Sequence, residues 1–156
     1  MKIEEAIKQK KFNSSKHKAI VNLFYTYHAI CDMHAGLFKK FDITSQQYNV
    51  LRILRGKHPD AIIVGYVKEV MLDKNPDLTR LCDRLLNKGY IVRNLNESNR
   101  RQVLIKITDK GLNLLKTIDP MVKQEEEKIN LTEKEAAFIA ISENNYVKHV
   151  EEYLAR

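Results

Sequence analysis

Residues 73–89, DKNPDLTRLCDRLLNKG, constrain the fold more than any other part of this chain. Asn75 suits the N-cap of a helix, Pro76 suits the first helical position, and Asp77 suits the positive end of the helix dipole. Gly89 suits the left-handed position that ends a helix. The apolar residues recur at the spacing of a single buried stripe, namely Leu78, Leu81, Cys82, Leu85 and Leu86. The segment therefore predicts an amphipathic helix with one buried face and one polar outer face.

Two apolar segments follow this helix and predict a β-hairpin. They are YIVRNL (90–95) and QVLIKIT (102–108), and the second shows the period-two alternation of a half-buried strand. The turn between them, NESNRR, places Arg100 and Arg101 side by side at the tip. A solvated turn needs only polarity, so two adjacent cations suggest an anionic partner. A merely solvated turn remains the alternative interpretation.

The rest of the chain is predicted to be mostly helical. It holds only five Gly and three Pro, so it has few helix breakers. Thr44 with Gln47, and Thr132 with Glu135, form the capping-box pattern that starts a helix. We expect helices over 17–38, after Thr44, over 64–73, after Thr108 and from the LTEKE segment at 131–135.

Length and charge limit the function classes. A chain of 156 residues suits a single domain with a sizeable core. The net charge is +7 and is unevenly distributed: 11 Lys and Arg against 5 Asp and Glu give +6 for residues 1–60, 8 against 4 give +4 for 75–110, and 5 against 8 give −3 for 121–156. A basic front and middle with an acidic tail indicates a polyanionic partner, although many soluble proteins are mildly basic.

The sequence shows no sign of catalysis, export or metal binding. It has no P-loop, GxSxG, HExxH or Gly-rich dinucleotide turn, so we expect no enzyme activity and no cofactor. It has neither an apolar segment of membrane-spanning length nor a secretory signal, which predicts a cytoplasmic protein. Cys31 and Cys82 lack CxxC spacing and a His pair, which argues against zinc and disulfides.

The order of the predicted elements is that of a winged helix–turn–helix. A short helix after Thr44, a second short helix, the well-capped helix that starts at Pro76 and the hairpin follow one another. In such a lobe the capped helix enters the major groove of DNA, and compact polar groups on its outer face meet base edges and phosphates. We expect Thr79 to contact a base edge or a phosphate, Arg80 to contact a guanine edge and Arg84 to contact a phosphate.

From about Ile43 to Leu115 the sequence resembles the MarR family of bacterial transcriptional regulators. The residues that carry the resemblance are TRLCDRLLNKGYIVRNLNESNRRQVLIKITDKG (79–111). The family pattern is T-R-hydrophobic-x-D-R-L, a KG turn, a wing with Asp-x-Arg, and a V-x-L-T-x-x-G exit. This chain departs from it at Asn99, which replaces the wing aspartate.

The resemblance implies a fold and a set of contacts. The fold is mainly α with a small β-hairpin wing: a winged helix–turn–helix lobe at about 43–115 and dimerisation helices at 17–38 and 116–154, all in a single domain, 1–156. Asp83 is expected to pair with Arg101 and brace the wing, which leaves Arg100 to reach the minor groove. The expected DNA-binding residues are Asn75, Pro76, Thr79, Arg80, Arg84, Asn87, Asn99 and Arg100.

The resemblance also implies a homodimer on a pseudopalindromic operator. The residues support it, because helix 17–38 is apolar on extra faces and 146–154 carries its own apolar stripe; intramolecular packing is the alternative. Relatives often sense a small aromatic effector or an oxidant at the cleft beside the dimerisation helices. Candidates to line such a cleft are Tyr25, His28, Asp32 and Tyr48, for which core packing is the plainer role.

Cys31 and the overall function each have two interpretations. Cys31 suits either an oxidation sensor or a small buried hydrophobe, and Cys82, on the apolar stripe, is expected to pack in the core. The function expected is a sequence-specific DNA-binding regulator, a repressor that responds to a small molecule or an oxidant. The alternative is a winged-helix module for protein–protein contact, which would expose apolar residues on the helix face instead.

Overall fold

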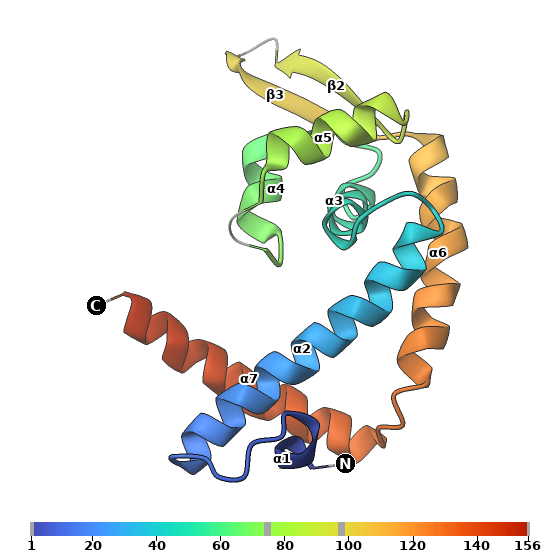
Figure 1. Ribbon diagram of the computed structural model, residues 1–156. Helices are drawn as coiled ribbons and strands as arrows, with labels where there is room; N and C mark the ends of the chain where they lie inside the picture. Colours follow the sequence, from blue (N-terminus) through green and yellow to red (C-terminus); the bar gives the residue numbers. More distant parts are fainter. Residues whose placement is uncertain (1, 74–75, 97–98, 156) are drawn as a thin grey trace. The chain divides into compact units, whose positions relative to one another are not determined.

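Helices occupy most of the chain, as the scarcity of Gly and Pro predicts. The computed structural model describes residues 2–73, 76–96 and 99–155, and of Asn96, Arg100 and Arg101 it describes the backbone alone. The elements in chain order are α1 (Ile3–Ala6), α2 (Ser15–Lys39), α3 (Ser45–Arg55), β1 (Ile62–Ile63), α4 (Val64–Val70), α5 (Leu78–Asn87), β2 (Ile91–Asn96), β3 (Asn99–Ile107), α6 (Asp109–Glu127) and α7 (Glu133–Leu154). This is the predicted architecture, mainly α with a small hairpin (Figure 1).

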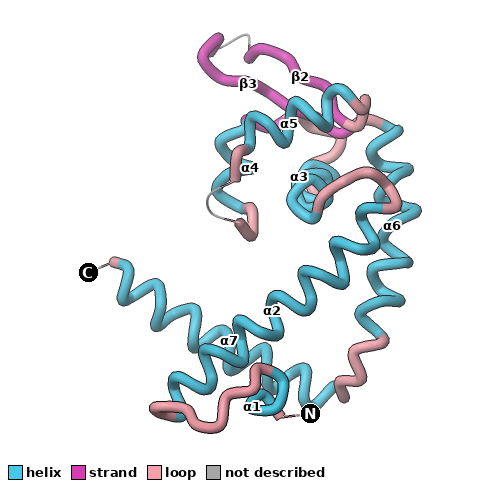
Figure 2. Tube along the Cα trace, in the orientation of Figure 1, coloured by secondary structure: helices cyan, strands magenta, loops and turns pink. Residues whose placement is uncertain are grey.

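The chain divides into two compact units, Met1–Lys123 and Gln124–Arg156. The first unit holds a lobe of α3, α4, α5 and a three-stranded antiparallel sheet with strand order β1-β3-β2. Figure 2 shows the strands gathered in this lobe, with α5 beside the hairpin. The second unit holds α7, which the Thr132–Glu135 capping box starts as predicted.

The core of the first unit explains why the lobe is rigid. Aliphatic side chains from α3, α4, α5, β2, β3 and α6 are buried together with Phe38 at the end of α2. The buried stripe predicted for α5 is confirmed: Leu78, Leu81, Cys82 and Leu85 are buried, and Leu86 packs partly buried against them. The core therefore holds α5 by one face only.

The predicted start and stop residues of several helices are confirmed. The Thr44 hydroxyl accepts from the N–H of Gln47, and the Gln47 amide oxygen accepts in return from the N–H of Thr44, which completes the predicted capping box. Gly89 has φ +72°, the left-handed conformation expected at a helix end. The Thr108 hydroxyl accepts from the N–H of Gly111 at the start of α6.

The start of α5 differs from the prediction. Asp77 is the N-cap, and its carboxylate accepts from the N–H of Arg80 at 3.1 Å. Pro76 therefore lies before the helix and is not its first residue, and Asn75 lies outside the described residues. Asp and Asn side chains cap a helix equally well. Asn75 and Asp77 lie two positions apart, so the sequence alone could not show which of them is the N-cap.

Two other elements, a helix end and a short strand, differ from the prediction. The helix expected over 64–73 ends at Val70, because Met71 is in an extended conformation and is buried in the core. Strand β1 was not predicted, since two residues are too few to show an alternation. Helix α6 begins directly after Thr108, as expected, and continues through Pro120 to Glu127.

Candidate nucleic-acid interface

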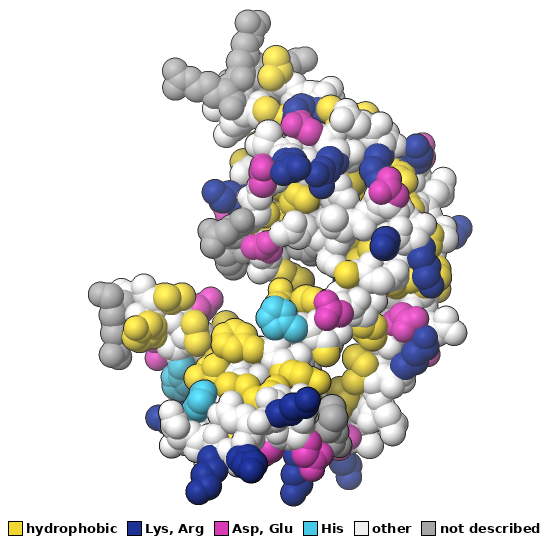
Figure 3. Space-filling view, in the orientation of Figure 1, with side chains coloured by type: hydrophobic (Ala, Val, Ile, Leu, Met, Phe, Trp, Pro, Cys, Tyr) yellow, Lys and Arg dark blue, Asp and Glu magenta, His cyan; other side chains and the backbone are white. Residues whose placement is uncertain are grey.

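The outer face of α5 presents a compact polar surface. Thr79, Arg80, Arg84 and Asn87 are all exposed, while the opposite face is buried in the core. Arg80 and Arg84 lie one helical turn apart and form no ion pair with any residue that the structure describes. Figure 3 shows Lys and Arg side chains over the lobe that contains α5. The helix thus offers two unpaired cations on a rigid support.

The first turn of α5 keeps two backbone donors. The N–H of Arg80 is bonded to Asp77, which leaves the N–H groups of Leu78 and Thr79 as the first two of the helix, without partners within it. Such a helix start attracts an anion through its free donors and its dipole, although the adjacent Asp77 carboxylate opposes this.

An ion pair joins the hairpin to α5. The Arg93 guanidinium on β2 lies 2.8 Å from the Asp83 carboxylate on α5. The sequence predicted Arg101 as the partner of Asp83. The side chain of Arg101 lies outside the described part of the chain. Arg93 was missed, although a signal existed. On a strand, Arg93 shares a face with Ile91, which is buried, so the period-two pattern points Arg93 toward α5.

The hairpin projects beyond the core. Its register runs from Ile91 opposite Ile107 to Leu95 opposite Val103, and an irregularity follows between Leu95 and Asn96. Leu95 is 64% exposed and Asn99 is also exposed, so the outer part of the hairpin has left the core. The predicted DNA contact of Arg100 falls on a side chain outside the described part and stays a prediction.

The four residues predicted to line an effector cleft do not share one environment. Tyr25, His28 and Asp32 are exposed along one side of α2. Tyr48 is only 8% exposed and stacks on Phe38 with ring centroids 4.6 Å apart. Its hydroxyl donates to the Asp119 carboxylate at 2.7 Å. Tyr48 therefore packs in the core, and its hydroxyl already has a hydrogen-bond partner. Core packing was the alternative role given for it.

Asp119 links α6 to α3 through two partners. It accepts from the Tyr48 hydroxyl and forms a salt bridge with Arg55. Burial alone would raise the pKa of Asp119, but the hydrogen bonds from Arg55 and Tyr48 outweigh it and hold the pKa below its ordinary value. Burial, with the hydrogen bond to Asp119, raises the pKa of Tyr48 to about 12. Nothing in the sequence pattern identified this cluster.

The two cysteines differ in accessibility. Cys82 is fully buried on the inner face of α5, and burial raises the pKa of its thiol, which fits the packing role expected for it. Cys31 on α2 is half-buried. The hydrogen bond between Tyr27 and Cys31 raises the pKa of Tyr27.

Two further properties concern metal ions and membranes. Within those ranges, no three His, Cys, Asp or Glu side chains gather in a way that would hold a metal ion. Along the same ranges, every helix is too short or too polar to cross a membrane.

Comparison with known proteins gives a consistent group of relatives. No family model matches the chain. A crystal structure of a MarR transcription factor from Planctomyces limnophilus is 31% identical, with a TM-score of 0.67 over 92% of this chain and 99% of that one. A mutant MarR from E. coli, crystallised with operator DNA, is 26% identical, with a TM-score of 0.70 over 85% and 99% of the two chains. The HTH-type transcriptional regulator PecS of Dickeya dadantii (strain 3937) is 30% identical over 83 residues, which is 53% of this chain and 50% of that protein.

Proposed function

This chain belongs to the MarR family of transcriptional regulators, and from that premise we propose that it binds duplex DNA sequence-specifically and regulates transcription. The single observation that carries the proposal is the exposed pair of cations on the outer face of α5. Arg80 and Arg84 form no ion pair among the described residues, although the protein as a whole carries 20 carboxylate side chains. Cations held on a rigid helix without partners fit the phosphates and base edges of DNA.

Each residue of the interface has a chemical role in the proposal. Helix α5 enters the major groove, where Thr79 and Arg80 meet base edges and Arg84 meets a phosphate. Asn87, the last residue of the helix, and Pro76, which precedes the N-cap Asp77, lie beside the phosphate backbone. The Arg93–Asp83 ion pair sets the angle between the hairpin and α5, so that the hairpin follows the neighbouring groove. Arg100 and Asn99, at the start of β3, contact the minor groove.

The proposal includes a homodimer. On α2 the exposed apolar side chains include Phe24 and Tyr27, which are 62% and 63% exposed. On α7 they include Phe138 and Tyr153, which are 73% and 75% exposed. Apolar surface of this extent is unfavourable in water and fits burial against a second copy of the chain. Two copies related by a two-fold axis present two α5 helices to a pseudopalindromic operator.

The proposed function extends to a regulatory role. The relatives are transcription regulators and not enzymes, and the E. coli relative was crystallised with operator DNA. We therefore assign this protein a repressor role in the cytoplasm, relieved by an effector or by oxidation of Cys31. In this scheme the whole chain, 1–156, works as a single domain, with the lobe at 43–115 and dimerisation helices at 17–38 and 116–154.

DNA binding is tested with selected duplexes. A random pool is enriched for bound DNA, and fluorescence anisotropy then measures affinity for the selected and for scrambled duplexes over a range of salt. Arg80→Ala is expected to reduce the preference for the selected sequence by about tenfold or more, the worth of a lost base contact. Arg84→Ala is expected to weaken both duplexes and to flatten the salt slope by about one unit.

A matched control comes from α6. Lys116 is exposed and lies outside the proposed interface, so Lys116→Ala is expected to leave affinity and salt slope unchanged. If the wild-type protein selects no sequence and shows no salt-sensitive duplex binding, the proposal fails.

The dimer is tested by sedimentation velocity on the full chain. A dimer is expected at micromolar concentration, and Tyr153→Glu is expected to weaken it, because a charge cannot be buried in an apolar interface without a large cost. Glu151→Gln is the control, since it is exposed and lies on the same helix. A wild-type protein that sediments as a monomer would refute the dimer and leave the DNA test standing.

A further inference from the structure

One face of the hairpin stays apolar beyond the point where the core covers it. Side chains alternate along a strand, and residues directly opposite each other share a face. The residues of this face, which we call the inner face, are Ile91, Arg93 and Leu95 on β2 and, opposite them, Ile107, Ile105 and Val103 on β3. The three isoleucines are fully buried and Val103 is partly buried, whereas Leu95 is 64% exposed. The outermost pair of this face therefore carries an uncovered leucine.

The inner face of the hairpin is turned toward α5. Arg93 forms its ion pair with Asp83 on α5 at 2.8 Å. Val103 and Arg93 also line one recess together with Thr79, which lies in the first turn of α5. Leu95 is paired with Val103 and so points to the same side, but it does not line the recess. Leu95 thus lies at the outer end of the face that looks toward α5.

Leu95 is level with the start of α5. The chain reverses direction at Gly89, so β2 runs back along the helix (Figure 1). From Arg93 to Leu95 the strand advances by about 6–7 Å. From Asp83 back to Thr79 the helix covers about 6 Å, so Leu95 lies beside the turn that holds Thr79. Since α5 begins at Leu78, no later turn of this helix extends over the leucine.

We propose that Leu95 packs against a deoxyribose of bound DNA, on the strand that separates the major groove from the minor groove. This inference rests on the proposed function, in which α5 enters the major groove and the hairpin follows the neighbouring groove. The backbone strand between the two grooves then passes between the first turn of α5 and the inner face of the hairpin. Leu95 is the exposed apolar side chain at that position.

The chemistry of the strand selects its sugar as the contact. The phosphates are charged and are matched by cations and by N–H or O–H donors. The C–H groups of the deoxyribose are the apolar part of the backbone, and a leucine removes them from water without leaving a polar group unpaired. A single exposed leucine is ordinary on a protein surface, but this one continues a buried apolar face and lies beside Thr79, a proposed DNA contact.

A sugar contact differs measurably from the other proposed contacts. Every nucleotide carries the same sugar, so loss of the contact weakens selected and scrambled duplexes by the same factor. A leucine releases no counterion, so the salt slope does not change. Arg80 is expected to set sequence preference and Arg84 to contribute to the salt slope, and Leu95 is expected to affect neither.

The test measures fluorescence anisotropy of the full chain with selected and scrambled duplexes over a range of salt. Leu95→Ala is expected to weaken both duplexes about tenfold, because most of the apolar surface of the side chain is removed. Leu95→Met keeps the apolar character and most of the volume, so it is expected to lose less affinity than Leu95→Ala. Since Leu95 is exposed, these substitutions leave the core intact.

The matched control is on the same strand. Val92 is 42% exposed and lies opposite Lys106 on the other face of the hairpin. Val92→Ala removes exposed apolar surface from the same strand, but that surface faces away from α5. It is expected to leave both affinities unchanged.

A photo-crosslink tests the contact directly. Benzophenone abstracts hydrogen from C–H groups that it touches, which include those of a deoxyribose. Leu95→p-benzoyl-phenylalanine is expected to crosslink to the selected duplex on illumination. The same substitution at Val92 is expected to give no crosslink.

Each contrary outcome has one meaning. Equal affinities for Leu95→Ala and Val92→Ala, a change in sequence preference or salt slope in Leu95→Ala, or no crosslink from position 95 would each overturn the contact. A weaker dimer of Leu95→Ala in sedimentation velocity would place the leucine between two copies and would also overturn it. If the wild type binds DNA in all these cases, the proposed function stands. A wild type that binds no duplex refutes the proposed function, and this inference with it.

Discussion

The contact between Tyr48 and Asp119 provides a direct test of how the lobe is held to α6. Replacing Tyr48 by Phe keeps the ring that stacks on Phe38 and removes only the hydroxyl that donates to Asp119 at 2.7 Å. A hydrogen bond to a charged group contributes about 1.5–3 kcal/mol. The Asp119 side chain is 34% exposed and keeps its salt bridge with Arg55, so water can replace part of the loss. We therefore expect Tyr48→Phe to lower the free energy of unfolding by about 1–2 kcal/mol.

The measurement is a double-mutant cycle with Asp119→Ala, by urea unfolding at one fixed protein concentration. The coupling energy between the two positions is expected to be about 1–2 kcal/mol, and changes in helix propensity at 119 cancel in the cycle. Tyr66→Phe is the matched control, because the Tyr66 ring contacts Lys57 and its hydroxyl bonds to no described residue. It is expected to change stability by less than about 0.5 kcal/mol.

The coupling should also depend on pH in a defined direction. The pKa of Asp119 is lowered in the folded protein, so the stability it contributes is complete above its unfolded pKa of about 4 and is lost as the pH falls through the lower folded value. A coupling energy near zero at pH 7, or one that grows on acidification, would refute the argument that this contact ties α3 to α6.

Three further results are expected. In Gly111→Ala the new Cβ would lie 2.4 Å from the Tyr90 oxygen, so the backbone must move and thermal unfolding should show a loss of about 3 kcal/mol. A Cβ added at Gly36 meets nothing within 4 Å, so Gly36→Ala should raise the free energy of unfolding by about 1 kcal/mol. Equal changes in the two variants would contradict the close contact between Gly111 and Tyr90. Arg93→Gln removes the ion pair between the hairpin and α5, so operator affinity should fall while stability changes by less than about 1 kcal/mol; unchanged anisotropy titrations would count against that brace. The pKa of Tyr48 is about 12, so the wild type should lose stability relative to Tyr48→Phe between about pH 10 and 12, measured by urea unfolding, and parallel pH curves would exclude this.

The sequence by itself determined most of the local structure. The buried stripe of α5, the capping boxes at Thr44 and Thr132 and the left-handed Gly89 were all predicted correctly. These features depend on residues within a few positions of one another, where helix geometry dictates which side chains share a face and which donors need a cap. The outer face of α5 followed from the same periodicity, and with it the exposed Thr79, Arg80, Arg84 and Asn87.

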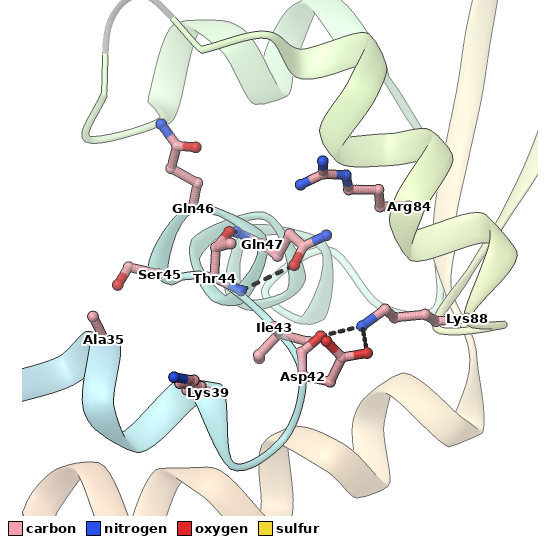
Figure 4. A pocket seen from close by; sticks show the side chains of 10 residues that line it. All are labelled: Ala35, Lys39, Asp42, Ile43, Thr44, Ser45, Gln46, Gln47, Arg84 and Lys88. Atoms are coloured by element: carbon pink, nitrogen blue, oxygen red, sulfur yellow. Dashed lines mark hydrogen bonds and ion pairs between the residues drawn. The ribbon is translucent and has the colours of Figure 1, made fainter.

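The tertiary structure decided which distant residues meet. Tyr48 and Asp119 are 71 positions apart. The sequence left Tyr48 open between an effector cleft and the core, because an aromatic residue has the same local pattern in a core and at its edge. Arg93, and not only Arg101, was available to Asp83, a choice that depends on the phase of the strand against α5. One recess of the first unit, drawn in Figure 4, is lined by Lys39, Gln47 and Arg84, which come from three different helices. Contacts of this kind depend on how elements pack, and sequence periodicity specifies the face of each element but not its partner.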